Sequence, residues 1–197
     1  MVRRYDCLQS LVKRLDNELV VTTLGGTAHE WGSLSGRDED LYLMGMGLVT
    51  ATGLGLALAL PGRKVLVLES DGSMLMNPSI FSALANKKPK NLVVICFDNQ
   101  CYNAVGGFPT ATASVADIAA MAQAAGLSLA STVSSLDDFD REIIAALKQD
   151  GPRVIVVKTD RWNAPVPTLD IDGQENKYRF ARHIEKSEGI KIFSAMK

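Results

Sequence analysis

The chain has 197 residues, of which 47% are hydrophobic and 22% are charged. This length can bury one substantial core, so we expect a single domain over residues 1–197, with residues 159–197 as an irregular tail. The 21 basic residues nearly balance the 22 acidic ones, and no basic run is present that would follow a phosphate backbone. We therefore expect no nucleic-acid partner.

The cysteines and the N-terminal residues indicate a reducing compartment. The 3 cysteines are odd in number and include no Cys-x-x-Cys pair, which argues against a disulfide framework and a structural zinc site. No apolar stretch follows the basic pair Arg3-Arg4, so we expect no secretory signal. These features predict a cytoplasmic protein.

Residues 41–60 carry no charge and are long enough to cross a bilayer. Gly45, Gly47, Gly53 and Gly55 interrupt the stretch, which also contains threonine. A short strand followed by a buried, glycine-lined helix is the simpler interpretation, so we expect no membrane partner.

Apolar spacing and turn residues predict the elements of the first half. The prediction is a helix over 3–15, a strand over 19–23, a long polar loop over 24–40, a strand over 41–44, a helix over 47–60, a strand over 64–69 and a helix over 78–85. Because a loop as long as 24–40 is uncommon in a compact domain, we expect it to carry function.

The second half continues the alternation of strands and helices. The prediction is a strand over 91–97, a polar loop over 98–113, a helix over 114–125, a strand over 128–132, a helix over 136–149, a strand over 153–157 and a short helix over 178–185. Continuous β-branched strands separated by helices are typical of an α/β fold with a parallel β-sheet and helices on both faces.

Two polar motifs follow consecutive predicted strands: Glu69-Ser70-Asp71-Gly72-Ser73 after the first and Asp98-Asn99 after the second. A single right-handed crossover helix between them makes the strands parallel and neighbouring, so Asp71 and Asn99 are expected at the same edge. Carboxylate and amide oxygens suit Mg²⁺, and Gly72 and Ser73 allow backbone N–H groups to approach phosphates. The sequence therefore predicts a metal–diphosphate site.

These motifs resemble the thiamine diphosphate-dependent 2-oxoacid decarboxylases. The signature of that family is Gly-Asp-Gly followed some thirty residues later by Asn-Asn or Asp-Asn, and one departure of this chain is Ser70 in place of the first glycine. The resemblance covers roughly residues 19–158. Within the family, the chain most resembles the β subunit of sulfopyruvate decarboxylase and the equivalent part of phosphonopyruvate decarboxylase. Further matching stretches are residues 45–59, 75–77, 89–94, 99–102 and 106–107.

The resemblance implies roles for the residues that match the family's motifs. Mg²⁺ ligands are implied at Asp71, Asn99 and the backbone carbonyl of Cys101. Diphosphate contacts are implied at Gly72 and Ser73, and at the first loop, which contains Gly25, Gly26 and Thr27. Contacts to the cofactor or the substrate are implied at Tyr102 and Asn103.

The resemblance also implies a conformational role for Gly45-Met46-Gly47. In the family a bulky apolar side chain at the position of Met46 bends the cofactor, which brings its amino group close to the reactive carbon. The carbonyl of Gly45 is then the acceptor for that amino group. Read without the resemblance, Met46 would be core filler.

A second domain is implied but is not encoded in these residues. The family places the cofactor between two domains, and a glutamate on the pyrimidine-binding domain activates it. A pyrimidine-binding domain would need about 150 further residues, which these 197 residues do not supply beside the first domain. We therefore expect a lyase that is active only with a pyrimidine-binding α subunit, in a homo- or hetero-oligomer, on a small anionic 2-oxoacid such as sulfopyruvate or phosphonopyruvate.

Several residues keep two interpretations. His29 either faces the substrate as a proton carrier or lies on the surface. Cys101 has no histidine near it in sequence, so its carbonyl is favoured over a nucleophilic thiol. The segment Arg161-Trp162-Asn163 either caps the crevice or belongs to a solvated tail.

Other functions remain as alternatives. The chain could be a subunit of an acetolactate synthase-type carboligase or of a 2-oxoacid oxidoreductase, or a non-catalytic protein with a vestigial site. The intact Asp71 and Asn99 argue against the vestigial site. A Mg²⁺-dependent phosphatase needs a nucleophilic aspartate with further carboxylates, an arrangement that Glu69 and Asp98 do not supply.

Overall fold

The computed structural model describes residues 1–193 and contains a six-stranded sheet in the order β2-β1-β3-β4-β8-β7. All neighbouring strands in this sheet are parallel, as the sequence predicts. The strands are β1 (Leu19–Thr22), β2 (Asp40–Tyr42), β3 (Val65–Ser70), β4 (Leu92–Asp98), β7 (Ala130–Val133) and β8 (Arg153–Lys158).

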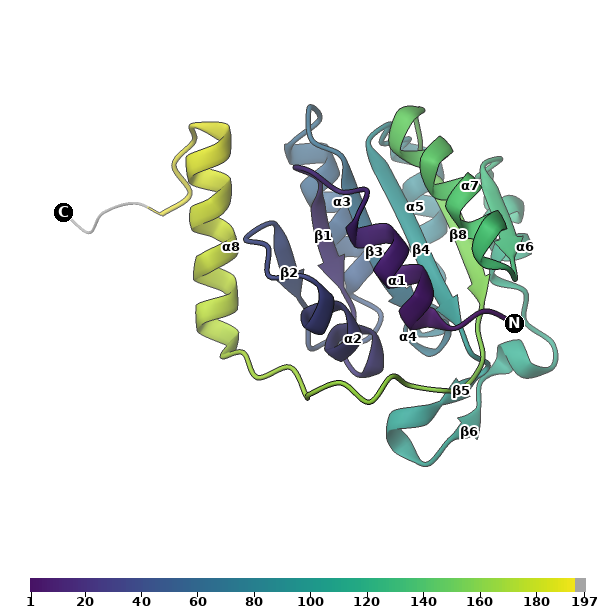
Figure 1. Cartoon of the computed structure of the whole chain (residues 1–197). Helices are drawn as coiled ribbons and strands as arrows, with labels where there is room; N and C mark the ends of the chain where they lie inside the picture. Colours follow the sequence, from purple (N-terminus) through teal and green to yellow (C-terminus); the bar gives the residue numbers. More distant parts are fainter. Residues whose placement is uncertain (194–197) are drawn as a thin grey trace.

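Helices cover both faces of the sheet (Figure 1). One face carries α1 (Arg4–Val12), α2 (Gly26–Leu34) and α7 (Leu136–Lys148), whose buried side chains form one core cluster with the sheet. The other face carries α3 (Val49–Ala59), α5 (Ile80–Lys87) and α6 (Ile118–Ala124), with α8 (Gly173–Glu188) at the edge. The predicted α/β fold is confirmed.

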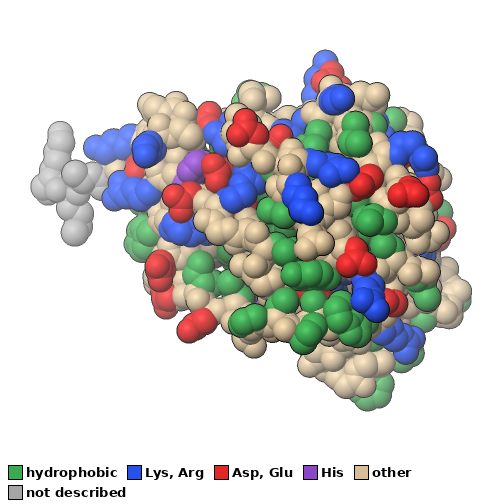
Figure 2. Space-filling view, viewed as in Figure 1, with side chains coloured by type: hydrophobic (Ala, Val, Ile, Leu, Met, Phe, Trp, Pro, Cys, Tyr) green, Lys and Arg blue, Asp and Glu red, His purple; other side chains and the backbone are tan. Residues whose placement is uncertain are grey.

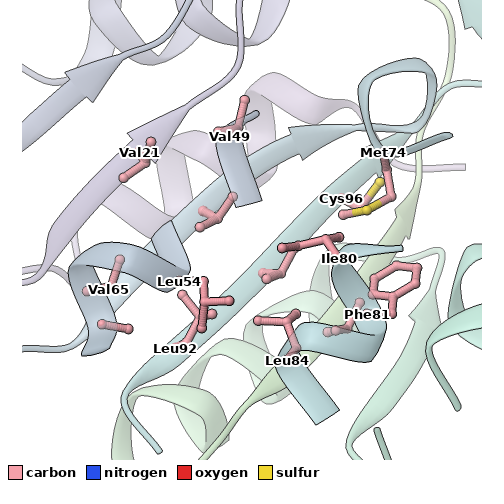
Figure 3. Packing of buried hydrophobic residues seen from close by; sticks show 14 of the residues in the cluster. Val21, Val49, Leu54, Val65, Met74, Ile80, Phe81, Leu84, Leu92 and Cys96 are labelled. Carbon is pink, nitrogen blue, oxygen red and sulfur yellow. The ribbon is translucent and has the colours of Figure 1, made fainter. Parts of the chain in front are cut away.

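The strands supply both cores because successive side chains point to opposite faces. In β3, Val65 and Val67 pack against the α3 side, whereas Leu66 and Leu68 pack against the α1 side. Figure 3 shows the first of these clusters, in which Leu54 of α3 and Leu84 of α5 meet the sheet. Burial on both faces explains why the strands read as continuous apolar runs.

Several parts of the structure differ from the predicted elements. The predicted loop over 24–40 contains α2, because Ala28 and Trp31 bury one side of a helix that its glycine and polar content conceals. The helix α4 (Asp71–Met76) begins directly after β3 and was not predicted. The predicted short helix over 178–185 is the longer α8, which begins after the capping side chain of Asp172.

The predicted loop over 98–113 contains two short strands and two short 3₁₀ helices. The strands β5 (Cys101–Tyr102) and β6 (Phe108–Pro109) pair antiparallel. The 3₁₀ helices are η1 (Asn103–Val105) and η2 (Ala111–Ala113). This hairpin lies below the carboxyl ends of the main sheet (Figure 1).

The tail over 159–172 crosses the molecule from β8 to α8 beneath the sheet (Figure 1). The N-terminal residues hold its first part, since Val2 forms a parallel bridge with Thr159 and the Arg3 guanidinium lies 4.7 Å from the Trp162 ring centroid. Figure 2 shows hydrophobic side chains gathered along the lower edge that the tail follows. Within residues 1–193, no helix has the length and apolar character needed to span a membrane.

Gly53 of α3 faces β3 and has no room for a side chain. A Cβ at this position would lie 2.2 Å from Cγ2 of Val67, whereas a Cβ on Gly55 would meet nothing within 4 Å. We expect Gly53→Ala to lower the free energy of unfolding by about 1–3 kcal/mol through overpacking. The matched variant Gly55→Ala should raise it by up to about 1 kcal/mol through helix propensity. Urea unfolding measures both, and equal effects of the two substitutions would refute the packing argument.

Candidate active site

A cavity of about 360 Å³ opens at the carboxyl ends of β1, β3 and β4. This edge is where ligands bind in open parallel sheets. The cavity is lined mainly by residues 23–27, 29–30, 70–72, 101–105 and 163–164, with Arg4, Met46, Phe97, Asn99 and Val166. It therefore brings together the first loop, the two polar motifs and the tail.

Asp71 is the first residue of α4 and follows β3 directly. Its side chain is 1% exposed, and its Oδ2 accepts a hydrogen bond of 2.6 Å from the Thr110 hydroxyl. Burial raises the pKa of the Asp71 carboxyl above its usual value, and the nearby Asp98 adds to the effect. A cation beside Asp71 would offset this cost by stabilising the charged form.

Asn99 follows β4 and holds a tight turn. Its Oδ1 accepts a hydrogen bond of 3.1 Å from the Cys101 backbone N–H, while Gln100 adopts a φ of +61°. Because β3 and β4 pair in parallel with Ser70 opposite Phe97, this turn lies beside Asp71. The prediction that Asp71 and Asn99 lie at the same edge of the sheet is confirmed. Asp71, Asn99 and Cys101 all line the cavity.

The thiol of Cys101 is engaged within its own loop. Its Sγ donates a hydrogen bond to Oδ1 of Asn103, and burial raises the pKa of the thiol. A protonated thiol is a poor nucleophile. This geometry agrees with the expectation that Cys101 contributes through its backbone.

The predicted glycines have different surroundings. Gly25 has a φ of +77°, and a Cβ there would meet nothing within 4 Å, so its backbone faces open space. At Gly72 a Cβ would lie 2.3 Å from the Tyr102 ring, and at Gly26 it would lie 2.6 Å from the Arg4 guanidinium. Gly72 and Gly26 therefore permit close protein contacts at the cavity wall.

Met46 lines the cavity, whereas Gly45, Gly47 and Ser73 are not among the lining residues. Gly45 and Gly47 flank Met46 in the sequence, and Ser73 contacts Gly47. The Gly47 N–H donates to the Ser73 hydroxyl at 3.0 Å, and the Asn77 side-chain amide donates to the Gly47 carbonyl at 2.9 Å. These two bonds hold the segment that carries Met46, and the Gly47 φ of +75° suits only glycine without strain.

Two charged residues of the cavity wall were missed by the sequence analysis. Arg4 of α1 and Glu30 of α2 form a buried ion pair, with Nε and Oε2 2.8 Å apart. Asn163 and Ala164 of the tail join it, because Arg4 Nη2 donates to Asn163 Oδ1 and the Ala164 N–H donates to Glu30 Oε1. The partners are far apart in sequence, so no local pattern signals the pair.

The other residues with two interpretations are now placed. His29 lines the cavity, and its Nδ1 accepts a hydrogen bond of 3.1 Å from the Leu169 N–H of the tail. Arg161, Trp162 and Asn163 are all exposed, and of the three Asn163 lines the cavity. Tyr102 and Asn103 line the cavity, as do Thr27 and Gly25 of the first loop.

The oxygen donors at this edge fit a hard cation bound together with an anion. Among residues 1–193, no group of three or more His, Cys, Asp or Glu side chains could hold a metal ion. One carboxylate, one amide and backbone carbonyls instead suit Mg²⁺, which completes its octahedron with water and phosphate oxygens. The open space over Gly25 leaves room for those phosphates.

Comparisons with known proteins agree with this geometry. Residues 35–157 match a protein family described as "Thiamine pyrophosphate enzyme, C-terminal TPP binding domain". The chain is 32% identical to sulfopyruvate decarboxylase subunit beta of Methanocaldococcus jannaschii, over 94% of this chain and 98% of that protein. It is 35% identical to the protein of the same name from Methanothermobacter thermautotrophicus, over 93% of this chain and 96% of that protein.

A solved structure with the same fold is benzoylformate decarboxylase from Polynucleobacter necessarius, with a TM-score of 0.69 at 20% identity. The match covers 83% of this chain and 34% of that chain, so this chain spans about a third of the longer enzyme. On the sequence matches and the fold together, the chain belongs to the thiamine diphosphate-dependent 2-oxoacid decarboxylases and corresponds to their thiamine diphosphate-binding C-terminal domain.

Proposed function

We propose that this chain is the Mg²⁺- and diphosphate-binding subunit of a non-oxidative decarboxylase that acts on a small anionic 2-oxoacid of the sulfopyruvate or phosphonopyruvate type. The observation that carries the proposal is the placement of Asp71 and Asn99 at the ends of adjacent parallel strands, on one cavity. The substrate class is supported by relatives named sulfopyruvate decarboxylase subunit beta, and by phosphonopyruvate decarboxylase of Streptomyces hygroscopicus at 39% identity over 69% of this chain.

In this proposal Asp71, Asn99 and the Cys101 carbonyl hold Mg²⁺. Backbone groups of Gly25, Gly26, Thr27, Gly72 and Ser73 hold the diphosphate. When bound, thiamine diphosphate supplies a nucleophilic carbon and an electron sink for loss of CO₂ from a 2-oxoacid. Bound to these residues, metal and diphosphate would lie at the buried floor of the cavity, where charge interactions are stronger than in water.

The remaining residues of the proposed site orient the ligands. Met46 would support the cofactor from a segment held by Ser73 and Asn77, and the Gly45 carbonyl would accept a hydrogen bond from the cofactor's amino group. Tyr102 and Asn103 lie on the hairpin side of the cavity, where they contact cofactor or substrate. The Arg4–Glu30 pair holds the tail at the cavity wall through the Ala164 N–H.

A partner subunit supplies the pyrimidine-binding half. Support comes from sulfopyruvate decarboxylase of Methanosarcina acetivorans, which is 31% identical over 92% of this chain, although the match covers only 47% of that longer protein. Beside Met46 the chain exposes an apolar rim, formed by Met44, Leu48 and Met76, which are 80%, 58% and 63% exposed. Large exposed apolar side chains beside a cavity are typical of a protein interface.

The cation ligand can be tested by Asp71→Asn, which keeps the side-chain shape and removes the charge. We expect Mg²⁺-dependent binding of thiamine diphosphate to weaken by more than the roughly 10–100-fold that loss of an outer-shell partner costs. Titration calorimetry with and without EDTA measures this on the chain and on its complex with the partner subunit. The exposed carboxylate Asp137 of α7 provides the control Asp137→Asn, which should bind as the parent does. Equal binding by Asp71→Asn would remove Asp71 from the site.

The apolar rim can be tested by Leu48→Glu. A charge placed in a desolvated interface should weaken association with the partner subunit by about tenfold or more. Sedimentation of the mixed subunits measures the association. The control is Ile144→Glu, at a residue of α7 that is 42% exposed and lies on the helix layer opposite α3. Unchanged association of Leu48→Glu would place the partner elsewhere.

A further inference from the structure

Two threonine side chains connect the buried carboxylates at the floor of the cavity. Thr110 and Thr112, here called the threonine bracket, are 3% and 5% exposed. The Thr110 hydroxyl lies 2.6 Å from Asp71 Oδ2, the Thr112 hydroxyl lies 2.7 Å from Asp98 Oδ1, and the two hydroxyls are 2.8 Å apart. A continuous chain of short contacts therefore joins Asp71 to Asp98.

The hairpin loop delivers the bracket to this position. After β6, the Thr110 N–H donates to the Gln100 carbonyl at 3.2 Å, and the Gln100 side-chain amide donates to the Thr112 carbonyl at 3.2 Å. Gln100 stands between Asn99 and Cys101 in the turn that follows β4. The bracket is thus tied to the same turn that carries the other proposed cation ligands.

The two carboxylates have different surroundings. Asp98 is fixed within the fold, because Lys158 Nζ lies 2.5 Å from its Oδ2 and the Gln100 N–H donates to its Oδ1 at 3.1 Å. Asp71 lines the cavity, and both bracket hydroxyls approach its Oδ2, the second at 3.3 Å. Neither hydroxyl therefore competes for Oδ1, which leaves that oxygen to a cation.

We propose that Thr110 and Thr112 are positioning residues for the cation site, which hold the Asp71 carboxylate in one orientation and fix its spacing from Asn99 and Cys101. The inference rests on the proposed function of this site. Mg²⁺ requires near-octahedral ligands at about 2.0–2.1 Å, whereas Ca²⁺ accepts variable geometry at about 2.3–2.6 Å. A fixed spacing therefore favours Mg²⁺, and loss of the bracket should reduce that preference.

The test uses the two-subunit complex at saturating thiamine diphosphate, titrated with Mg²⁺ and separately with Ca²⁺ in a calorimeter. Thr110→Val removes the hydroxyl and keeps the shape, and it should weaken Mg²⁺ binding by about 10–100-fold. The loss for Ca²⁺ should be smaller, so the ratio of the two affinities falls. Thr110→Ser restores the hydroxyl and should bind Mg²⁺ nearly as the parent does. Thr112→Val should show the same change of ratio, which keeps the test valid if Thr110→Val does not fold.

A matched control is Thr132→Val, since Thr132 is exposed on β7, away from the cavity. Mg²⁺ affinity of the folded valine variants equal to that of the parent would overturn the inference. So would equal losses for both cations, or a loss that Thr110→Ser shares. The proposed function fails separately, because a parent complex without any Mg²⁺-dependent binding overturns both proposals, whereas normal parent binding with insensitive variants overturns only the bracket.

Discussion

The parallel pairing of β3 with β4 determines where the chemistry of this protein can occur. With Ser70 opposite Phe97, both strands end at the same edge of the sheet, and the residues that follow them are brought together without any long side chain. Asp71 and Asn99 are short, and each is the first residue after its strand. A shift of one residue in this pairing would turn every strand side chain to the opposite face, so the two cores and the site depend on the same register.

The packing around these strands gives the site its rigidity. Both faces of β3 and β4 are covered, so neither strand can move without disturbing a helix layer. Two of the buried carboxylates near the site are paired with cations, Asp98 with Lys158 and Glu30 with Arg4. Breaking such a buried pair by removing one partner leaves an uncompensated charge, which is much more costly than losing an exposed pair. Each of these two pairs must therefore be kept or removed as a whole.

The sequence predicted the sheet, most helices, and the meeting of Asp71 with Asn99, because each depends on local patterns or on one crossover connection. It did not predict α2, since the glycine and polar residues of the first loop conceal a helix whose buried apolar side chains are only Ala28 and Trp31. Nor could it predict the Arg4–Glu30 pair, whose partners are 26 residues apart, or the approach of Thr110 to Asp71, which are 39 residues apart. Such contacts depend on how loops fold back on the sheet, and a single sequence carries no periodic signal for that.

The N-terminal residues take part in the active-site edge of the molecule. Val2 pairs with Thr159, and Arg4 lines the cavity, so the start of the chain lies beside the first part of the tail (Figure 1). α8, in contrast, lies at the far edge of the sheet beyond β2. An affinity tag or fused domain ahead of Met1 would therefore stand next to the cavity and the path of the ligands, whereas one joined beyond α8 would start from the opposite edge and leave that path free.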